Sequence, residues 1–192
     1  MIGIKKNKQF GFSLMETLIA TTIFVVVILL VSQIFIMVID SADKIHKNFV
    51  LQESLKLFTE TAFRDLRMAR LESGEDYVFS NYRFDESFSV NSGITYMSAY
   101  NRRCNIGLVY DEDTGVNRVA MRNGLFNGSE YFLTPAKINI EYLRFVIDED
   151  VVGGERQQQP RVTILVRAKT NTGSDESSLI LQTTISSRMY DE

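Results

Sequence analysis

A long uncharged stretch lies near the start of the chain. Residues 17–39 contain no charged side chain, and at a rise of 1.5 Å per residue they would form a helix of about 34 Å. A hydrocarbon core is roughly 30 Å thick, so this stretch predicts one membrane-spanning helix. The flanking charges are basic before it and acidic after it: Lys5, Lys6, Lys8, Asp40 and Asp43. This bias predicts a cytoplasmic N-terminus, with the residues after about 40 on the far side of the membrane.

The pattern after residue 40 is amphipathic. Apolar residues recur there at three- and four-residue steps, and charged residues fall largely between them. The apolar positions are Ala42, Ile45, Phe49, Leu55, Phe58, Ala62, Leu66 and Ala69. No Gly or Pro occurs in residues 12–73, which predicts one unbroken helix that Gly74 ends. We expect the outer half of this helix to lay its apolar face on a folded domain. Coiled-coil pairing is the alternative, although the heptad is irregular.

From about residue 75 the period of the pattern changes to two, which is typical of β-strands. Strands are predicted at 94–100, 106–110, 116–122, 138–147, 162–168 and 179–185. Turns are predicted at 111–115, 123–124, 127–128 and 171–174, with a polar loop at 148–159. A phase slip at Tyr142–Leu143 indicates a β-bulge. We therefore predict an α+β fold, in which the amphipathic helix covers one face of an antiparallel meander.

Together these patterns divide the chain into four parts. They are a basic leader at 1–11, a transmembrane helix at 12–39, the amphipathic half of the same helix at 40–73, and a β-rich head at 74–192. A secretory signal peptide is the alternative for the first two parts. Its apolar region is usually 7–15 residues long and small residues follow it. Here the apolar run is longer and no Ala-x-Ala pattern closes it, so we expect the helix to stay in the mature protein.

Charge and rare residues restrict the possible functions. The net charge is −3, and without the three leader lysines residues 12–192 carry −6, so no nucleic-acid partner is predicted. Cys104 is the only cysteine, which excludes an intramolecular disulfide, and we expect its side chain to be buried or half-buried. His46 is the only histidine and lies beside the membrane segment, where a catalytic triad is not expected. With no nucleophile motif and no Gly-rich phosphate loop, the sequence predicts a non-enzymatic protein without a cofactor.

Two acidic runs, at 111–113 and 148–150, are the candidates for a metal site. Calcium takes six to eight oxygen ligands in a shaped loop, and neither run has the spacing of an EF-hand. The acidic residues of the first run are typical of a turn, and we expect those of the second run to lie in a solvated loop. We therefore predict no metal site.

Glu16 is the exception in the apolar stretch, since it lies just inside the predicted helix. A charged side chain at the centre of a membrane costs roughly 2.5–3.5 kcal/mol on insertion scales, and less near a helix end. A glutamate at the membrane surface that favours the N-terminal end of the helix dipole is one interpretation. A buried ion pair with a positive group of a partner is the other.

The stretch Gly11-Phe12-Ser13-Leu14-Met15-Glu16-Thr17-Leu18-Ile19-Ala20 resembles the cleavage and methylation site of type IV pilin-like proteins, both prepilins and type II secretion pseudopilins. The resemblance implies that prepilin peptidase cuts after Gly11 and that Phe12 becomes an N-methylated N-terminus. It also implies that Glu16 neutralises the Phe12 amine of a neighbouring subunit in a filament. The apolar segment at 25–39 would then pack against the same helix of its neighbours.

The subtype rests on weaker resemblances. The segments 159–164 and 181–188 are similar to the tails of minor pilins and minor pseudopilins of the J or W type. The head is large for a major subunit and cannot close the disulfide that many major pilins contain. The expected partners are prepilin peptidase, other pilins or pseudopilins, an inner-membrane assembly platform and membrane lipid. A major pilin of an uncommon lineage, or a tethered binding module with an uncleaved anchor, are the alternatives.

Overall fold

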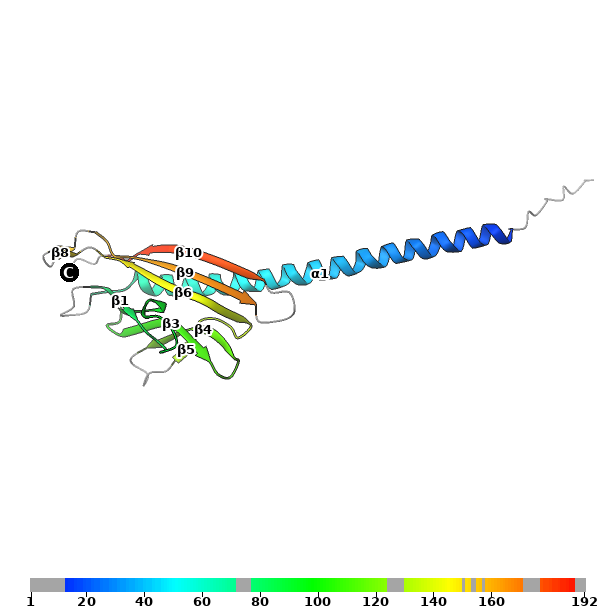
Figure 1. The fold of residues 1–192 in the computed structure, drawn as a ribbon. Helices are drawn as coiled ribbons and strands as arrows, with labels where there is room; N and C mark the ends of the chain where they lie inside the picture. Colours follow the sequence, from blue (N-terminus) through cyan, green and yellow to red (C-terminus); the bar gives the residue numbers. More distant parts are fainter. Residues whose placement is uncertain are drawn as a thin grey trace, which may run out of the picture. The chain divides into compact units, whose positions relative to one another are not determined.

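A computed structural model describes residues 13–71, 77–123, 130–149, 151–152, 155–156, 158–170 and 177–188 (Figure 1). The chain divides into two compact units, Met1–Asp43 and Lys44–Glu192. The first contains the N-terminal part of a long helix. The second contains the rest of that helix and all the strands. The predicted α+β class, with one long N-terminal helix and antiparallel sheets, is confirmed.

The helix α1 runs without a break from Leu14 to Arg67. The prediction that Gly74 ends the helix is wrong, because α1 ends several residues earlier. The amides of Met68 and Ala69 donate to carbonyls only three residues back, and the amide of Arg70 donates to the Met97 carbonyl at 2.9 Å. The bridge between Arg70 and Met97 therefore takes the chain out of the helix and onto a strand. Gly74 itself lies outside the described residues.

The buried face of α1 within the second unit begins later than predicted. Its buried residues are Leu51, Ser54, Leu55, Phe58, Thr59, Ala62 and Leu66. Ile45 and Phe49, which we expected on this face, are exposed, and Ala42 in the first unit is exposed as well. Residues three and four positions apart lie on the same face of a helix. The face that contains Phe49 continues with Gln52, Glu53, Lys56 and Glu60, which are all exposed, so this face points away from the core.

The first sheet has five strands in the order β1-β2-β3-β4-β5, and all neighbours are antiparallel. The strands are β1 (Phe79–Tyr82), β2 (Gly93–Met97), β3 (Arg103–Asp111), β4 (Val116–Asn123) and β5 (Glu130–Phe132), with a 3₁₀ turn, η1 (Val90–Ser92), before β2. The predicted strands at 94–100, 106–110 and 116–122 are confirmed with small shifts of their ends. The strands β1 and β5 were not predicted from the sequence.

The second sheet has three antiparallel strands in the order β10-β9-β6. They are β6 (Ile138–Asp148), β9 (Arg161–Thr170) and β10 (Ser178–Ser186), and a small hairpin of β7 (Val151–Val152) and β8 (Glu155–Arg156) lies within the predicted polar loop. The predicted bulge is confirmed, since the register shifts between Ile140 and Tyr142. The predicted meander is thus divided between two sheets. The turns expected at 124, 127–128 and 171–174 lie outside the described residues.

One hydrophobic core joins α1 to both sheets within the second unit. Phe58 and Leu66 come from the helix, Ile94 and Ile106 from the first sheet, and Phe145 from the second, and all five are almost fully buried. Burying each such side chain stabilises the fold by about 1.5–3 kcal/mol. The single core explains why the two sheets and the second half of α1 form one unit.

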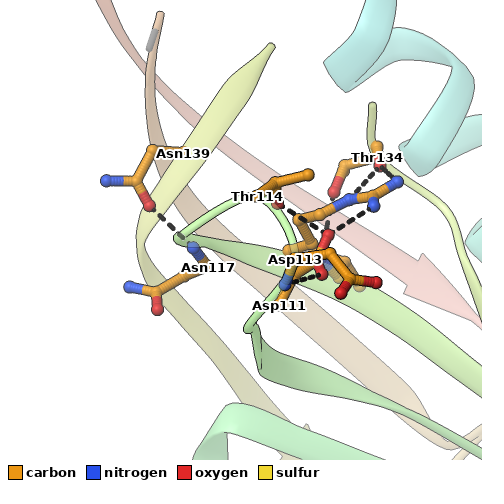
Figure 2. Close-up of polar contacts among 8 residues, drawn as sticks. Asp111, Asp113, Thr114, Asn117, Thr134 and Asn139 are labelled. Carbon is orange, nitrogen blue, oxygen red and sulfur yellow. Dashed lines mark hydrogen bonds and ion pairs between the residues drawn. The ribbon is translucent and has the colours of Figure 1, made fainter. Parts of the chain in front are cut away.

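A polar cluster lies at the turn between β3 and β4 (Figure 2). Asp111 Oδ2 accepts hydrogen bonds of 2.7 Å from the Thr114 hydroxyl and from Arg118 Nη1. Arg118 Nε and Nη2 also donate to the Thr134 carbonyl, at 2.9 and 2.7 Å. The two hydrogen bonds that Asp111 accepts, from Thr114 and from Arg118, lower the pKa of its carboxyl group, and the Thr114 hydroxyl is the largest cause. The predicted turn is confirmed, and Gly115 adopts φ +70° in it, which glycine does without strain.

Glu149 contradicts the prediction of a solvated acidic loop at 148–150. Its side chain is half-buried, and its carboxylate accepts hydrogen bonds from the amides of Val78, at 2.8 Å, and Phe79, at 3.3 Å. These amides lie where β1 begins, and buried backbone donors require an acceptor. The carboxylate therefore fixes β1 to the end of β6. Asp150 lies outside the described residues.

Candidate functional site

The start of α1 is fixed by Ser13. Its side-chain oxygen accepts a hydrogen bond from the Glu16 amide at 3.3 Å, and its carbonyl accepts from the amides of Glu16 and Thr17. Ser is a preferred N-cap residue because its oxygen satisfies an amide that has no partner within the helix. The sequence Ser13-x-x-Glu16 is also the capping-box pattern. The helix therefore begins at a defined place, with Glu16 in its first turn.

The Glu16 carboxylate is exposed in this first turn. Among residues 13–71 and the other described segments, no positively charged side chain forms an ion pair with it. The positive end of the helix dipole favours a carboxylate here, by typically 0.3–1 kcal/mol at an exposed site. This leaves the carboxylate available to a positive group from outside the described part of the chain. The structure thus places Glu16, whereas Gly11 and Phe12 lie outside the described residues.

The helix that follows Glu16 is apolar on all sides. The large apolar side chains from Leu18 to Ile39 are each 46–70% exposed, and none is covered by another part of the described chain. An 18-residue window of α1 has a mean hydropathy of 3.0, which meets the length and composition of a membrane-crossing helix. A helix that is apolar all round requires lipid or other helices around it. The arrangement therefore fits a membrane anchor and a helix that packs against others.

The hydroxyl groups in this segment are satisfied by the helix itself. Thr17, Thr21 and Thr22 each donate to a carbonyl three or four residues back, at 2.8–3.0 Å. Ser32 and Ser41 do the same, at 2.8 Å. In lipid an unsatisfied donor costs several kcal/mol, so these internal bonds make the polar side chains compatible with a membrane. These hydrogen bonds could have been predicted from the sequence, because Ser and Thr in a helix commonly donate to the carbonyl three or four residues back.

A second candidate site is a pocket of ≈ 310 Å³ in the second unit, beside the last turn of α1 and the first sheet. It is lined by Arg64, Asp65, Met68, Ser98, Ala99, Tyr100, Arg102, Cys104, Met121 and Tyr131. Arg64 and Asp65 form an ion pair at 3.6 Å. The guanidinium carbon of Arg102 lies 6.0 Å from the centre of the Tyr100 ring. The pocket therefore combines both charges with aromatic and sulfur-containing side chains.

The chemistry of this pocket does not support catalysis. Cys104 is 2% exposed, which confirms the expected burial, and that burial raises the pKa of its thiol. Burial, and next the Asp65 charge, raise the pKa of the neighbouring Tyr96. The hydroxyls of Tyr96 and Ser98 are buried without a hydrogen-bond partner among the described residues. A protonated thiol is a poor nucleophile, and buried hydroxyls of this kind are commonly satisfied by water.

The remaining candidate residues from the sequence, His46 and Asp111, do not belong to a common site. His46 lies exposed on α1, and Asp111 belongs to the turn cluster described above. Within the described ranges, no group of three or more His, Cys, Asp or Glu side chains is arranged to hold a metal ion. Apart from Cys104, the residues that line the pocket belong to no motif that could be recognised in the sequence.

Comparison with known families adds one finding. Residues 6–32 match the family model described as the prokaryotic N-terminal methylation motif. The chain has a prepilin-type N-terminus. This motif supports a type IV pilin-like protein and indicates a structural subunit of the pilin or pseudopilin type. It covers about one-seventh of the chain, from the second half of the leader through Glu16 to Ser32 in the apolar helix. No curated protein and no solved structure shows a significant match.

The geometry that bears on this motif lies at the start of α1. A capped first turn, an exposed carboxylate and an apolar helix follow one another along the chain. Such an arrangement can bind a positive group next to an apolar surface. The motif also implies processing by prepilin peptidase and assembly with other pilins.

Proposed function

We propose that the chain is a minor pilin or minor pseudopilin, a non-enzymatic structural subunit of a type IV pilus or a type II secretion-like filament. The observation that carries the proposal is the methylation motif at 6–32 on a helix whose apolar side chains are uncovered. A subunit that leaves the membrane and enters a filament exchanges lipid for neighbouring helices around these side chains. The uniform apolar surface suits both environments.

In this proposal prepilin peptidase cuts after Gly11, and Phe12 becomes the methylated N-terminus. The Glu16 carboxylate then pairs with the Phe12 amine of a neighbouring subunit. The exposed position of Glu16 in the first turn, with no positive partner among the described residues, supports this role. An ammonium and a carboxylate in a low dielectric are strongly penalised when either is left alone. The pair would therefore fix the axial register between subunits.

Before assembly the subunit would lie in the inner membrane. The lysines before the helix and the aspartates after it favour a cytoplasmic N-terminus and a head outside. The expected partners are prepilin peptidase, the other pilins or pseudopilins, the assembly platform and membrane lipid. A cytoplasmic ATPase would supply the energy for extraction, because this chain contains no Gly-rich phosphate loop.

The minor role is supported by the head. It has no disulfide, since Cys104 is the only cysteine, and its fold depends instead on the core that joins α1 to two sheets. The resemblance of 159–164 and 181–188 to minor subunits of the J or W type points the same way. A major pilin of an uncommon lineage is the second candidate, and the abundance of the chain in sheared filaments distinguishes the two.

The experiment that tests the proposal is the intact mass of the membrane-extracted protein, expressed with and without a prepilin peptidase. We expect the loss of residues 1–11 only when the peptidase is present, with the mass of one added methyl group. A Gly11→Leu variant is the control, because a bulky side chain at the cleavage position would leave the leader attached. An unchanged mass with an active peptidase would contradict the proposal and favour a permanently tethered module.

A further inference from the structure

The pocket beside the end of α1 contains hydroxyl groups that the fold leaves without partners. Tyr96 is 2% exposed, and its hydroxyl has no hydrogen-bond partner among the described residues. The buried Ser98 hydroxyl has none within these segments either. Native folds rarely leave such donors unsatisfied, because the loss of their bonds to water is then not compensated. Two of them in one place indicate a site for a molecule that accepts hydrogen bonds.

Both hydroxyls lie on the side of the first sheet that faces the pocket. Three residues of the pocket lining are neighbours of the Tyr96 hydroxyl, namely Asp65, Cys104 and Tyr131. In the register of β2 and β3, Tyr96 lies directly opposite Cys104, so these two side chains share one face of the sheet. Ser98 lines the pocket itself. The unsatisfied donors therefore belong to the pocket and not to a separate part of the core.

A cationic side chain accompanies these hydroxyls. Arg102 is half-buried in the lining, and no carboxylate of the described residues forms an ion pair with it. The Ser98 amide donates to the Arg102 carbonyl at 2.8 Å, so the hairpin turn between β2 and β3 holds the two residues together. Burial raises the pKa of the Cys104 thiol, whereas the Ser98 hydroxyl and the Arg102 charge act in the opposite direction, which places both beside the thiol. A guanidinium and a hydroxyl therefore face the same part of the pocket.

The charge of the lining favours an anion. Its charged residues are Arg64, Asp65 and Arg102, which carry a net charge of +1. Asp65 forms an ion pair with the exposed Arg64 at 3.6 Å, so it does not neutralise Arg102. A carboxylate only accepts hydrogen bonds, and those that it receives from a guanidinium are charge-assisted and often bidentate. A cationic ligand would instead meet two guanidinium groups.

The rest of the lining is largely apolar or aromatic. Met121 is 3% exposed and Met68 is 40% exposed. The Tyr131 hydroxyl donates to Met121 Sδ at 2.7 Å, so its ring and not its hydroxyl is available to a ligand. Thioether groups are polarizable and make favourable contacts with aromatic rings. The volume of ≈ 310 Å³ is at the lower end of the range of ligand pockets, roughly 300–1,000 Å³, and it suits a small molecule with an apolar body.

We propose that this pocket binds a small organic molecule with one carboxylate group and an apolar body. The carboxylate accepts hydrogen bonds from the Arg102 guanidinium and the Ser98 hydroxyl, and the Tyr96 hydroxyl lies at the same end of the site. The body of the ligand lies against the side chains of Met68 and Met121. No step of this proposal involves the leader or a filament, so it is independent of the proposed function.

The test is NMR of the full chain in detergent, with isotopic labels in the methyl groups of its methionines. The probe is hydrocinnamate, and the matched probes are its neutral amide and phenylpropylamine, which is a cation. Met68 and Met121 report on the pocket, whereas the exposed Met15 and Met37 of α1 report the uptake of a probe by the detergent. We expect saturable shifts at Met68 and Met121. The Kd of the carboxylate should be at least ~10-fold lower than that of the amide or the amine, because only the carboxylate forms charge-assisted hydrogen bonds with Arg102.

Three variants sharpen the test. Arg102→Gln should raise the Kd of hydrocinnamate at least ~10-fold and keep the hairpin turn, which uses only the Arg102 backbone. Arg144→Gln is the matched control, because it removes the same charge from an exposed position of β6 outside the pocket lining, and its Kd should stay within ~2-fold of the parent value. Tyr96→Phe should raise the Kd at least ~3-fold, whereas the thermal unfolding temperature of the ligand-free chain should not fall, since the variant removes a hydroxyl without a partner.

Each outcome decides the proposal. Shifts confined to Met15 and Met37 would show uptake by the detergent, and no shift at any methionine would show that water alone satisfies the hydroxyls; either result overturns the proposal. Equal affinities for the carboxylate and the amide would show an apolar pocket without an anion site and overturn it as well. An equal loss of affinity in Arg102→Gln and Arg144→Gln would mean general electrostatic attraction and have the same consequence. A carboxylate preference that depends on Arg102 alone of these two arginines would support the proposal.

Discussion

The two halves of α1 contain many of the same residue types but have different surroundings. From Leu18 to Ile39 every large apolar side chain is exposed, on all sides of the helix. From Lys44 to Arg67 the buried residues form one stripe that includes Leu51, Phe58 and Leu66, and the opposite side is charged. The first half therefore needs an apolar environment supplied from outside, whereas the second half obtains one from its own sheets. The difference shows that the distribution of apolar residues around a helix, more than their number, determines what it packs against.

The largest effect that this comparison predicts is on the second half. Phe58 is fully buried and Leu57, beside it on the helix, is 58% exposed. Replacing Phe58 by Ala should destabilise the second unit by about 3–5 kcal/mol, because the side chain leaves a cavity in the core that joins both sheets. The free energy of unfolding, measured by urea denaturation of the detergent-solubilised chain, checks this.

Leu57→Ala is the matched control for Phe58→Ala. It should change the free energy of unfolding by no more than about 0.5 kcal/mol, as is usual for exposed positions. Equal losses for the two variants would mean that the stripe on α1 does not separate core from surface.

The second prediction concerns the first half of α1 and assembly. Replacing Glu16 by Ala should reduce incorporation into filaments at least ~10-fold, because removing one partner of a buried ion pair leaves the other charge uncompensated. Leader cleavage should continue, and the second unit should unfold as before. The amount of the chain in sheared filaments, relative to the membrane fraction, measures the effect.

Met15→Ala is the control for Glu16→Ala, since Met15 is exposed in the same helical turn. It should assemble as the parent chain does. Normal incorporation of the Glu16 variant would count heavily against the proposed ion pair, and would leave the dipole interpretation of this glutamate.

The sequence predicted the local elements of the second unit well and its long-range contacts less well. The turn at 111–115 was predictable because Asp111 and Gly115 are both turn residues and begin and end one five-residue turn. The bulge near Tyr142 was visible as a phase slip. By contrast, the end of α1 depends on a backbone bond between Arg70 and Met97, and β1 depends on the carboxylate of Glu149. Neither contact has a local signal.

For the candidate sites too, some features could be predicted from the sequence and others could not. Glu16 could be singled out because a charge in an apolar run is unusual, and its N-cap follows from Ser13 three residues before it. The predicted buried face failed at Ile45 and Phe49, because apolar residues at helical spacing do not reveal where the folded domain begins. The pocket beside Asp65 and Cys104 is formed by segments that are distant in sequence, so no spacing could have indicated it.

The third prediction uses the pH dependence of the second unit. Hydrogen bonds from Thr114 and Arg118 hold the pKa of Asp111 below its usual value near 4. A lowered folded-state pKa contributes stability that is present above the unfolded-state pKa and is lost as the pH falls through the folded-state pKa. The Asp111→Asn variant should therefore be less stable than the parent by a constant amount above about pH 5, and this difference should shrink below about pH 4.

Urea denaturation at a series of pH values measures the Asp111 effect, and Asp113→Asn is its control. Only the backbone amide of Asp113 takes part in the cluster, through its bond to Asp111 Oδ1, so the change of its side chain should have little effect at any pH. A difference between the Asp111 variant and the parent that persists unchanged below pH 3 would contradict the assignment. The first half of α1 should contribute nothing to this profile.

The smallest predicted effect compares two threonines on the same helix. Thr22 and Thr59 each donate their hydroxyl to carbonyls three and four residues back, at 2.8–2.9 Å. Thr→Ser keeps this bond and removes one methyl group. Thr59 is buried in the core of the second unit, so Thr59→Ser should lower the free energy of unfolding by about 0.8 kcal/mol, the value of one buried methylene.

Thr22→Ser should leave that free energy unchanged within about 0.3 kcal/mol, because Thr22 is exposed and touches no core, and distant sites act independently. Since both variants retain the same local hydrogen bond, any difference between them comes from the surroundings of the methyl group. If the two variants lowered the free energy of unfolding equally, the cause would be the lower helix propensity of serine and not the surroundings of the methyl group. The contrast between the two halves of α1 would then not extend to single methyl groups. A loss at Thr59 alone would extend the contrast to the smallest change that the helix allows.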